Sequence, residues 1–473
     1  MSDINIQALK EEKKVLSITS LAEFAERYGY YVIQSLLIFY LIEKFGIHQD
    51  SAASLVGTTL SMVYISAILG GFIAERYIGY YRSGFLGSIL MLAGFSVLAI
   101  SSSETMLCLG LSFISVSTGL IKSNMASFIG RFYDKSGLPE AKRDFGFNIF
   151  YMGINLGSFG ALFVASWLKD NYGFSAPFYS SIMIGGFMFV LLLVGFGVLK
   201  KHIADTKLTL VNAIKITVIL SIYILVLFFI FKNPILAGLS IVVAIVGSIV
   251  ILLLSIKNSS VKKVIVAGIF FALSIVYWGL YFQMFICFLL FTQYSVDTSV
   301  LSPSQFLSVE SLSILVFASI MGKFWVYIDS KGYGVRDIDK FNIAFVLIVA
   351  TFCIILLPIL LSSPLAKVSM YGFIFAYIVL GISELSLSAI GLSLITKIAP
   401  KGFVALYMGI WLVTLGIGGK LGGVMASYIS IPKDNLALSK IKMTEGLYAF
   451  IAIAICTSVF ILIIRNYVNK NCH

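Results

Sequence analysis

Three charged side chains stand close together inside the first long apolar stretch of the chain. They are Glu23, Glu26 and Arg27, with apolar residues on both sides. A charge at the centre of a membrane-spanning helix costs about 3 kcal/mol to insert, so such residues face a watery cavity or one another. On a helix Glu23 and Arg27 lie one turn apart, and Tyr30 and Gln34 continue the same stripe. The spacing predicts that something polar passes through a membrane protein.

Isolated polar side chains recur in the later apolar stretches. They are Lys122, Asn155, Glu310, Glu384 and Lys420. With the first cluster they bring together carboxylates and cations in nearly balanced numbers, which favours pairing within a common cavity.

The composition indicates a membrane protein. Of 473 residues 59% are hydrophobic and 12% are charged, about half the usual charged share. Apolar runs recur along the whole chain, so a removable signal peptide does not explain them. The five cysteines have no close pairing, which argues against a disulfide framework or a metal site.

The net charge of +12 is explained better by membrane topology than by nucleic acid. Most basic residues outside the apolar stretches fall on one side when the N-terminus is placed in the cytoplasm. The positive-inside rule therefore predicts that both ends are cytoplasmic, with basic loops against anionic lipid.

We predict an all-α protein with fourteen transmembrane helices. The predicted spans are 17–43, 52–75, 83–101, 105–133, 145–168, 177–199, 211–231, 235–256, 263–292, 305–327, 341–361, 369–396, 402–430 and 444–467. They divide into a cytoplasmic segment (1–16), a six-helix bundle (17–200), a linker with two extra helices (201–260), a second six-helix bundle (261–467) and a tail (468–473).

Several motifs, in order along the chain, carry a family resemblance. The stretch 70–82 resembles the G-x-x-x-D-R-x-G-R/K signature of major facilitator transporters, with Glu75 in place of aspartate. The pattern E-x-x-E-R-[FY]-x-Y-Y from residue 23, Lys122 and F-Y-x-x-I-N-x-G-S at 150–158 resemble the proton-dependent oligopeptide transporter family. The block 383–400 and the stretch 408–411 resemble the family's tenth and eleventh core helices.

The resemblance implies a major facilitator fold of two six-helix bundles plus an inserted helix pair, working by alternating access. It implies proton coupling by Glu23, Glu26 and Arg27. Lys122 would serve the peptide carboxylate or an ion pair between bundles. Further peptide contacts would come from Tyr30, Asn155, Glu384 and Trp411.

The residue chemistry agrees with a peptide substrate. A dipeptide is a zwitterion, which needs an anionic group for its ammonium and a cationic group for its carboxylate. Because no histidine falls within a predicted span, the proton carriers would have to be buried carboxylates or a lysine.

Three positions depart from the family pattern. Phe282 occupies the place of a glutamate that commonly pairs with the family's counterpart of Lys122, next to Gln283, which we include among the substrate-binding residues. Glu310 replaces an asparagine, and we expect it to pair with Lys122 as a gate or with Lys420 as a static pair.

The third departure is Gln34, which stands where many members carry an arginine that helps to bind the peptide carboxylate. Glutamine donates hydrogen bonds but supplies no charge, so altered specificity follows as an alternative.

We therefore predict a proton-coupled symporter of di- and tripeptides in the bacterial inner membrane, acting as a monomer on small peptides and protons. The alternative is a transporter of the same family for an amino acid, nitrate or a peptide-like metabolite. We find no nucleophile, metal cluster or cofactor motif that would indicate an enzyme, and we expect no cofactor and no nucleic-acid partner. A sensor would need a sizeable soluble domain, for which the predicted loops are too short.

Overall fold

The computed structural model describes residues 3–203, 209–331, 335–400 and 402–471. Within these ranges the chain is helical almost throughout, and its one β-bridge joins Val296 to Val368. Thirteen helices of the described part are long and apolar enough to cross a membrane. They overlap thirteen of the fourteen predicted spans.

The remaining predicted span, 17–43, lies in a helix that carries Glu23, Glu26 and Arg27 and is therefore less apolar than the other thirteen. This first helix, α1, runs from Asp3 to Phe39 and is followed by one π-helical turn at Tyr40–Lys44. The described part of segment 1–16, predicted only as a cytoplasmic lead-in, is thus helical and continuous with the first span.

The first half of the chain continues with five further long helices and one short one. They are α2 (Gln49–Ile73, extended by a π-helical turn, Ala74–Ile78), α3 (Tyr80–Ala99), α4 (Glu104–Ser136), α5 (Glu140–Tyr172), α6 (Ser175–Val198) and α7 (Lys200–Ile203). The signature loop predicted at 70–82 is therefore mostly helix. Its tight turn is made at Gly79, whose φ of 80° is unfavourable for residues with a side chain.

The second half begins with the extra helix pair. The pair consists of α8 (Leu210–Lys232) and α9 (Pro234–Ser255). The helices that follow are α10 (Val261–Tyr281), α11 (Cys287–Ser295), α12 (Pro303–Ser330), α13 (Asp337–Leu361), α14 (Met370–Ile398), α15 (Val404–Ser427) and α16 (Leu436–Asn471). The predicted span 263–292 is interrupted, because a 3₁₀ turn at Phe282–Phe285 separates α10 from α11. Broken helices in membranes are tolerated where neighbouring groups satisfy the freed backbone.

The residues group into two compact units. Unit 1 comprises Met1–Leu36 and Met62–Ala237, and unit 2 comprises Leu37–Ser61 and Gly238–His473. The first part of α2 therefore belongs to unit 2 and its remainder to unit 1. The bundle boundaries predicted from the sequence stay a prediction.

In unit 1, α3 packs against α4 and α6, and α4 packs against α8. The closest backbone approach is between α2 and α4, where a Cβ added to Gly119 would lie 2.4 Å from the carbonyl oxygen of Ser66. The extra helix α8 is tied to the same place, since the hydroxyls of Ser66 and Tyr223 lie 3.0 Å apart. These contacts set the position of the α4 segment that carries Lys122.

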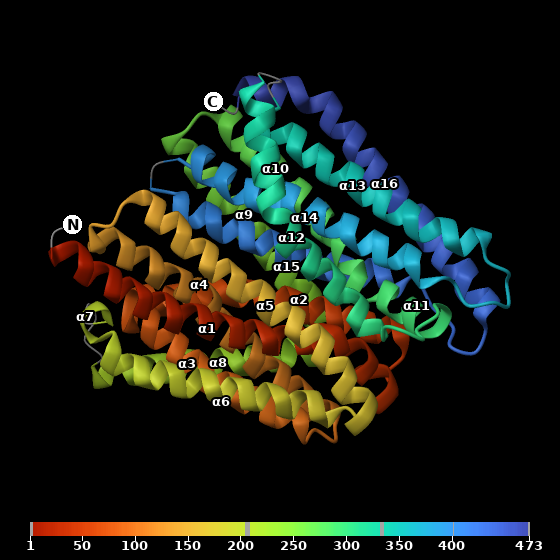
Figure 1. Ribbon diagram of the computed structural model, residues 1–473, viewed down its shortest axis with the longest axis horizontal. Helices are drawn as coiled ribbons and strands as arrows, with labels where there is room; N and C mark the ends of the chain where they lie inside the picture. The colour runs from red at the N-terminus through yellow and green to blue at the C-terminus, as the bar shows by residue number, and fades with distance from the viewer. Residues whose placement is uncertain (1–2, 204–208, 332–334, 401, 472–473) are drawn as a thin grey trace. The chain divides into compact units, whose positions relative to one another are not determined.

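In unit 2, α13 packs against α14 and α16, which Figure 1 shows running alongside each other in blue tones. The helix α10 packs against α15, and α12 packs against α14. The second extra helix, α9, exposes most of its apolar side chains, as expected for a surface that faces lipid. Its end is held by a 2.8 Å hydrogen bond between the hydroxyls of Ser255 and Tyr407.

We predict that Gly119→Ala destabilises the protein by about 1–3 kcal/mol, because the added methyl group would overlap the α2 backbone. The melting temperature of the detergent-purified protein measures this. Gly186→Ala in α6 is the matched control, because a Cβ there meets no atom within 4 Å. Equal melting temperatures for the two variants would contradict the close α2–α4 contact.

Candidate functional site

The charged cluster of α1 is buried inside unit 1. Glu23 and Glu26 are each 1% exposed and Arg27 is 2% exposed. The guanidinium of Arg27 binds Glu26 through two hydrogen bonds, Nε to Oε2 at 2.5 Å and Nη2 to Oε1 at 2.7 Å. A two-point contact of this kind is the strongest pairing available to a guanidinium and a carboxylate.

Glu23 is the more loosely held carboxylate. Its Oε1 lies 3.8 Å from Nε of Arg27, whereas its Oε2 is buried and has no hydrogen-bond partner among the described residues. The helical spacing suggested Glu23 as the partner of Arg27, but the main partner is the adjacent Glu26. An unsatisfied buried carboxylate oxygen is costly, unless a proton or a ligand occupies it.

Two tyrosines lie against the cations of unit 1. The Arg27 guanidinium sits 4.5 Å from the ring centre of Tyr30, and Lys122 Nζ sits 3.9 Å from that of Tyr64. The two rings meet edge to face with their centres 6.4 Å apart. Lys122, predicted from its motif, therefore lies near the α1 cluster, and it attracts Glu23 electrostatically.

Gln34 lies on the same face of α1. Its amide nitrogen donates a 2.8 Å hydrogen bond to Tyr30 Oη, while its amide oxygen is buried and accepts no hydrogen bond from the described residues. The predicted stripe of Tyr30 and Gln34 is thus present, and one polar atom on it remains available for a ligand.

The helix α5 reaches this region through small residues. A Cβ on Gly157 would lie 2.4 Å from the carbonyl oxygen of Phe24, so α1 and α5 touch closely there. Asn155, two residues earlier, is 5% exposed and donates its amide hydrogen to Tyr151 O in its own helix at 2.9 Å. The described contacts give Asn155 a structural bond but none to the α1 charges.

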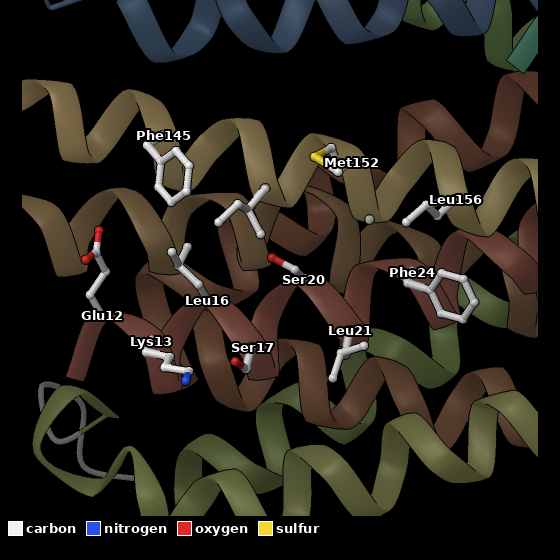
Figure 2. A pocket seen from close by; sticks show the side chains of 12 residues that line it. Glu12, Lys13, Leu16, Ser17, Ser20, Leu21, Phe24, Phe145, Met152 and Leu156 are labelled. Carbon is white, nitrogen blue, oxygen red and sulfur yellow. The ribbon is translucent and has the colours of Figure 1, made fainter. Parts of the chain in front are cut away.

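An apolar pocket of about 570 Å³ also lies between α1 and α5, and Figure 2 shows its lining. Leu16, Ser20 and Phe24 line it from α1, and Phe145 and Met152 line it from α5. None of the predicted site residues lines this pocket. Its mainly apolar walls suit hydrocarbon better than the charged ends of a peptide.

In unit 2, the acidic residues predicted in α12 and α14 meet at one tyrosine. The hydroxyl of Tyr281 lies 2.8 Å from Glu310 Oε1 and 2.5 Å from Glu384 Oε2. Glu310 is 3% exposed and also accepts a 3.2 Å hydrogen bond from Ser311 Oγ. The sequence analysis predicted both carboxylates as site residues but did not predict that they lie next to each other.

Lys420 is held by neutral oxygens. Its ammonium donates to Ser54 Oγ at 3.0 Å, to Thr58 Oγ1 at 2.9 Å and to the carbonyl of Ser54 at 3.4 Å. These three bonds use the donors of the ammonium. The described residues show no ion pair between Lys420 and Glu310, so the static pair is absent from this conformation. The gate between Glu310 and Lys122 stays a prediction.

Two predicted binding residues of unit 2 serve helix packing. Gln283 donates to the carbonyl oxygens of Gly279 at 2.9 Å and of Gly422 at 3.0 Å, which binds the break after α10 to α15. Trp411 is 2% exposed, and its ring fills the space above Gly391. In this conformation the amide of Gln283 is used within the protein, and the assignment of Gln283 and Trp411 to the site stays a prediction.

Sequence reasoning missed four polar residues of these clusters, namely Tyr64, Tyr281, Ser54 and Thr58. For Tyr281 a signal existed, since Tyr277 and Tyr281 lie one helical turn apart within an apolar stretch. No comparable spacing marked Ser54 or Thr58, because small hydroxyl residues are common in membrane helices.

The polar side chains of both units are suited to binding charged groups and protons. Within the described ranges no three metal-ligating side chains of His, Cys, Asp or Glu come together. Unit 1 instead holds a cluster of cationic and anionic side chains, and unit 2 holds a pair of acidic side chains. Such groups bind ions, zwitterions and protons.

Comparisons with known proteins agree on one family. The chain is 25% identical to dipeptide and tripeptide permease A of Escherichia coli (strain K12), over 96% of this chain and 92% of that protein. It is 26% identical to the permease of the same name from Erwinia pyrifoliae, over 95% of this chain and 94% of that protein.

Solved structures give the same fold. A bacterial homologue of the human drug peptide transporters PepT1 and PepT2 superposes with a TM-score of 0.84 at 21% identity, over 97% of this chain and 99% of the other. A peptide transporter POT in complex with sulfate superposes with a TM-score of 0.81 at 25% identity, over 97% and 95%. The major facilitator fold predicted from the sequence is therefore confirmed.

The family model described as the POT family matches residues 81–441. This range covers well over half of the chain and holds Lys122, Glu310 and Glu384. The chain is a multi-pass inner-membrane protein and belongs to the POT family, the proton-dependent oligopeptide transporters.

Proposed function

We propose that this protein imports di- and tripeptides together with protons across the inner membrane by alternating access. Family membership supports a transporter rather than an enzyme, and the relatives named dipeptide and tripeptide permease support peptides as the cargo. The observation that carries the proposal is the burial of both cationic and anionic side chains within each unit, because a zwitterionic peptide needs both.

The roles follow from charge. We propose that Lys122 binds the peptide carboxylate and that Glu384 binds the peptide ammonium. Tyr30 and Gln34 supply hydrogen bonds, and Gln34 Oε1 is a buried acceptor that a peptide N–H can fill. Asn155, Gln283 and Trp411 would contact substrate only in a conformation in which their packing contacts are rearranged.

Proton coupling is assigned to the α1 cluster. Glu23 Oε2 is the group that can take a proton without breaking an existing bond. Protonation of Glu26, in contrast, would break the two-point bond to Arg27 and leave a buried cation to find another partner. That release is a local change that can bias a conformational equilibrium. We further propose cytoplasmic termini and a monomeric transporter.

A second candidate substrate class is supported by Gln34. Because this side chain supplies no positive charge, the carboxylate of a peptide relies mainly on lysine. An amino acid, nitrate or a peptide-like metabolite is the corresponding alternative cargo.

The direct test is uptake of labelled dialanine into proteoliposomes under an imposed pH gradient, acid outside. We expect accumulation that collapses with a protonophore and is reduced by unlabelled di- and tripeptides but not by amino acids or nitrate. Absence of uptake and of competition by any peptide would overturn peptide transport, and competition by nitrate or an amino acid alone would favour the second candidate.

Glu23→Gln and Glu26→Gln should each lower gradient-driven uptake at least about tenfold, which corresponds to about 1.4 kcal/mol. Glu26→Gln should also lower the melting temperature more, because Arg27 loses its two-point partner. The exposed carboxylate Glu104 provides the control variant Glu104→Gln. Full uphill uptake by both cluster variants would refute the coupling role.

Lys122→Gln should weaken competition by dialanine at least about tenfold but weaken competition by dialanine amide much less, because the amide carries no carboxylate. Inhibition of labelled-peptide counterflow measures both. Lys215→Gln, in the exposed part of α8, is the matched control. An equal loss for the two competitors would show that Lys122 does not recognise the carboxylate.

A further inference from the structure

In unit 2, Glu310, Tyr281 and Glu384 lie so close together that one hydroxyl hydrogen is too few for their two contacts. The single hydroxyl of Tyr281 lies within hydrogen-bond distance of two carboxyl oxygens, Glu310 Oε1 and Glu384 Oε2. A phenol carries one hydrogen and can donate it to only one of them. If both carboxyl groups were ionised, one carboxylate oxygen would face the lone pairs of the phenol oxygen with no hydrogen between them.

Burial makes that fully ionised state unfavourable. Glu310 is 3% exposed and Tyr281 is 5% exposed, while Glu384 is half-buried, so water screens the two negative charges only in part. The two carboxyl groups also interact directly with each other. Two carboxylates that share a buried site retain one proton between them, because like charges at short range cannot both persist.

The titratable neighbours that the pair meets within unit 2 are two tyrosines and, beyond them, a cysteine. Tyr277 faces the pair from α10, and Tyr377 faces it from α14 with Cys287 beyond. All three are neutral or would add negative charge on ionisation. The cation of α15, Lys420, is committed to Ser54 and Thr58.

We propose that Glu310, Tyr281 and Glu384 form a proton-binding site in which the two carboxyl groups share one proton and present a single negative charge to the ammonium end of the substrate. One carboxyl group donates its hydrogen to Tyr281 Oη, which donates its own to the other carboxylate. This chain of two hydrogen bonds satisfies both short contacts. Glu310 thus acts as a proton carrier in this conformation.

The single negative charge of the protonated pair matches the single positive charge of a peptide ammonium. This match rests on the proposed function, peptide transport. A doubly ionised pair carries two negative charges, of which one ammonium cancels one. The singly protonated pair is neutralised completely, so proton and peptide are held together in one site. A symporter must bind its proton and its substrate at the same time. This site would therefore carry a proton in addition to the one assigned to the α1 cluster.

Infrared spectroscopy of the purified full-length protein tests the shared proton without any transport, when the spectrum of each variant is subtracted from that of the wild type. Wild type and the exposed-carboxylate control Glu104→Gln should show the carbonyl stretch of a buried protonated carboxyl group. Glu310→Gln should lose this band. Tyr281→Phe should shift it, because a hydrogen bond to the carboxyl group is removed, and this second variant keeps the test open if Glu310→Gln fails to fold. An unchanged band in either folded variant would overturn the shared proton.

Adding peptide tests the recognition step separately. Dialanine should shift the frequency of the band without abolishing it, because its ammonium binds the pair that keeps the proton. N-acetyl-dialanine, which lacks the ammonium, should leave the frequency unchanged. Equal responses to both compounds would overturn ammonium binding at this site. Failure of peptide transport itself would appear only in the uptake assay, since the band of the protein without peptide does not depend on substrate.

Discussion

The structure depends on one constraint, which is that a charge inside a membrane helix must be neutralised or hydrogen-bonded where it lies. Each buried charge here meets it differently. Arg27 uses two bonds to one carboxylate, Lys420 uses neutral oxygens of Ser54 and Thr58, and Glu310 meets a second acid across Tyr281. Only the last solution requires an additional proton.

Close helix contacts hold these groups in position. The backbones of α2 and α4 meet at Gly119, three residues before Lys122, and α1 meets α5 at Gly157. The break between α10 and α11 follows directly after Tyr281, and the amide of Gln283 bonds it to α15. Buried polar groups gain fixed positions from such contacts, since a packed interior resists small displacements. Residues that never touch a peptide therefore determine where the charges lie.

Periodicity and composition were enough to predict the helices, because long apolar stretches in a membrane have few alternatives to helix. They also identified every charged member of the clusters. Partners were harder to predict. The helical spacing of Glu23 and Arg27 suggested a pair, yet a long guanidinium reaches the adjacent Glu26 more favourably. For Glu310 the sequence suggested Lys122 or Lys420 as a partner, whereas the contacts described in unit 2 are a phenol and another acid, and the pair with Lys122 stays a prediction. Sequence spacing defines neighbours within one helix, but it does not define which helices pack together.

We propose that peptide and protons move together, with the protons carried by the acidic side chains of α1 and α12. The most direct measurement is the internal pH of proteoliposomes, reported by an enclosed dye, after unlabelled dialanine is added outside with no imposed gradient. We expect acidification that is abolished by Glu23→Gln and reduced by Glu310→Gln. Entry of dialanine without any change of internal pH would contradict this proposal.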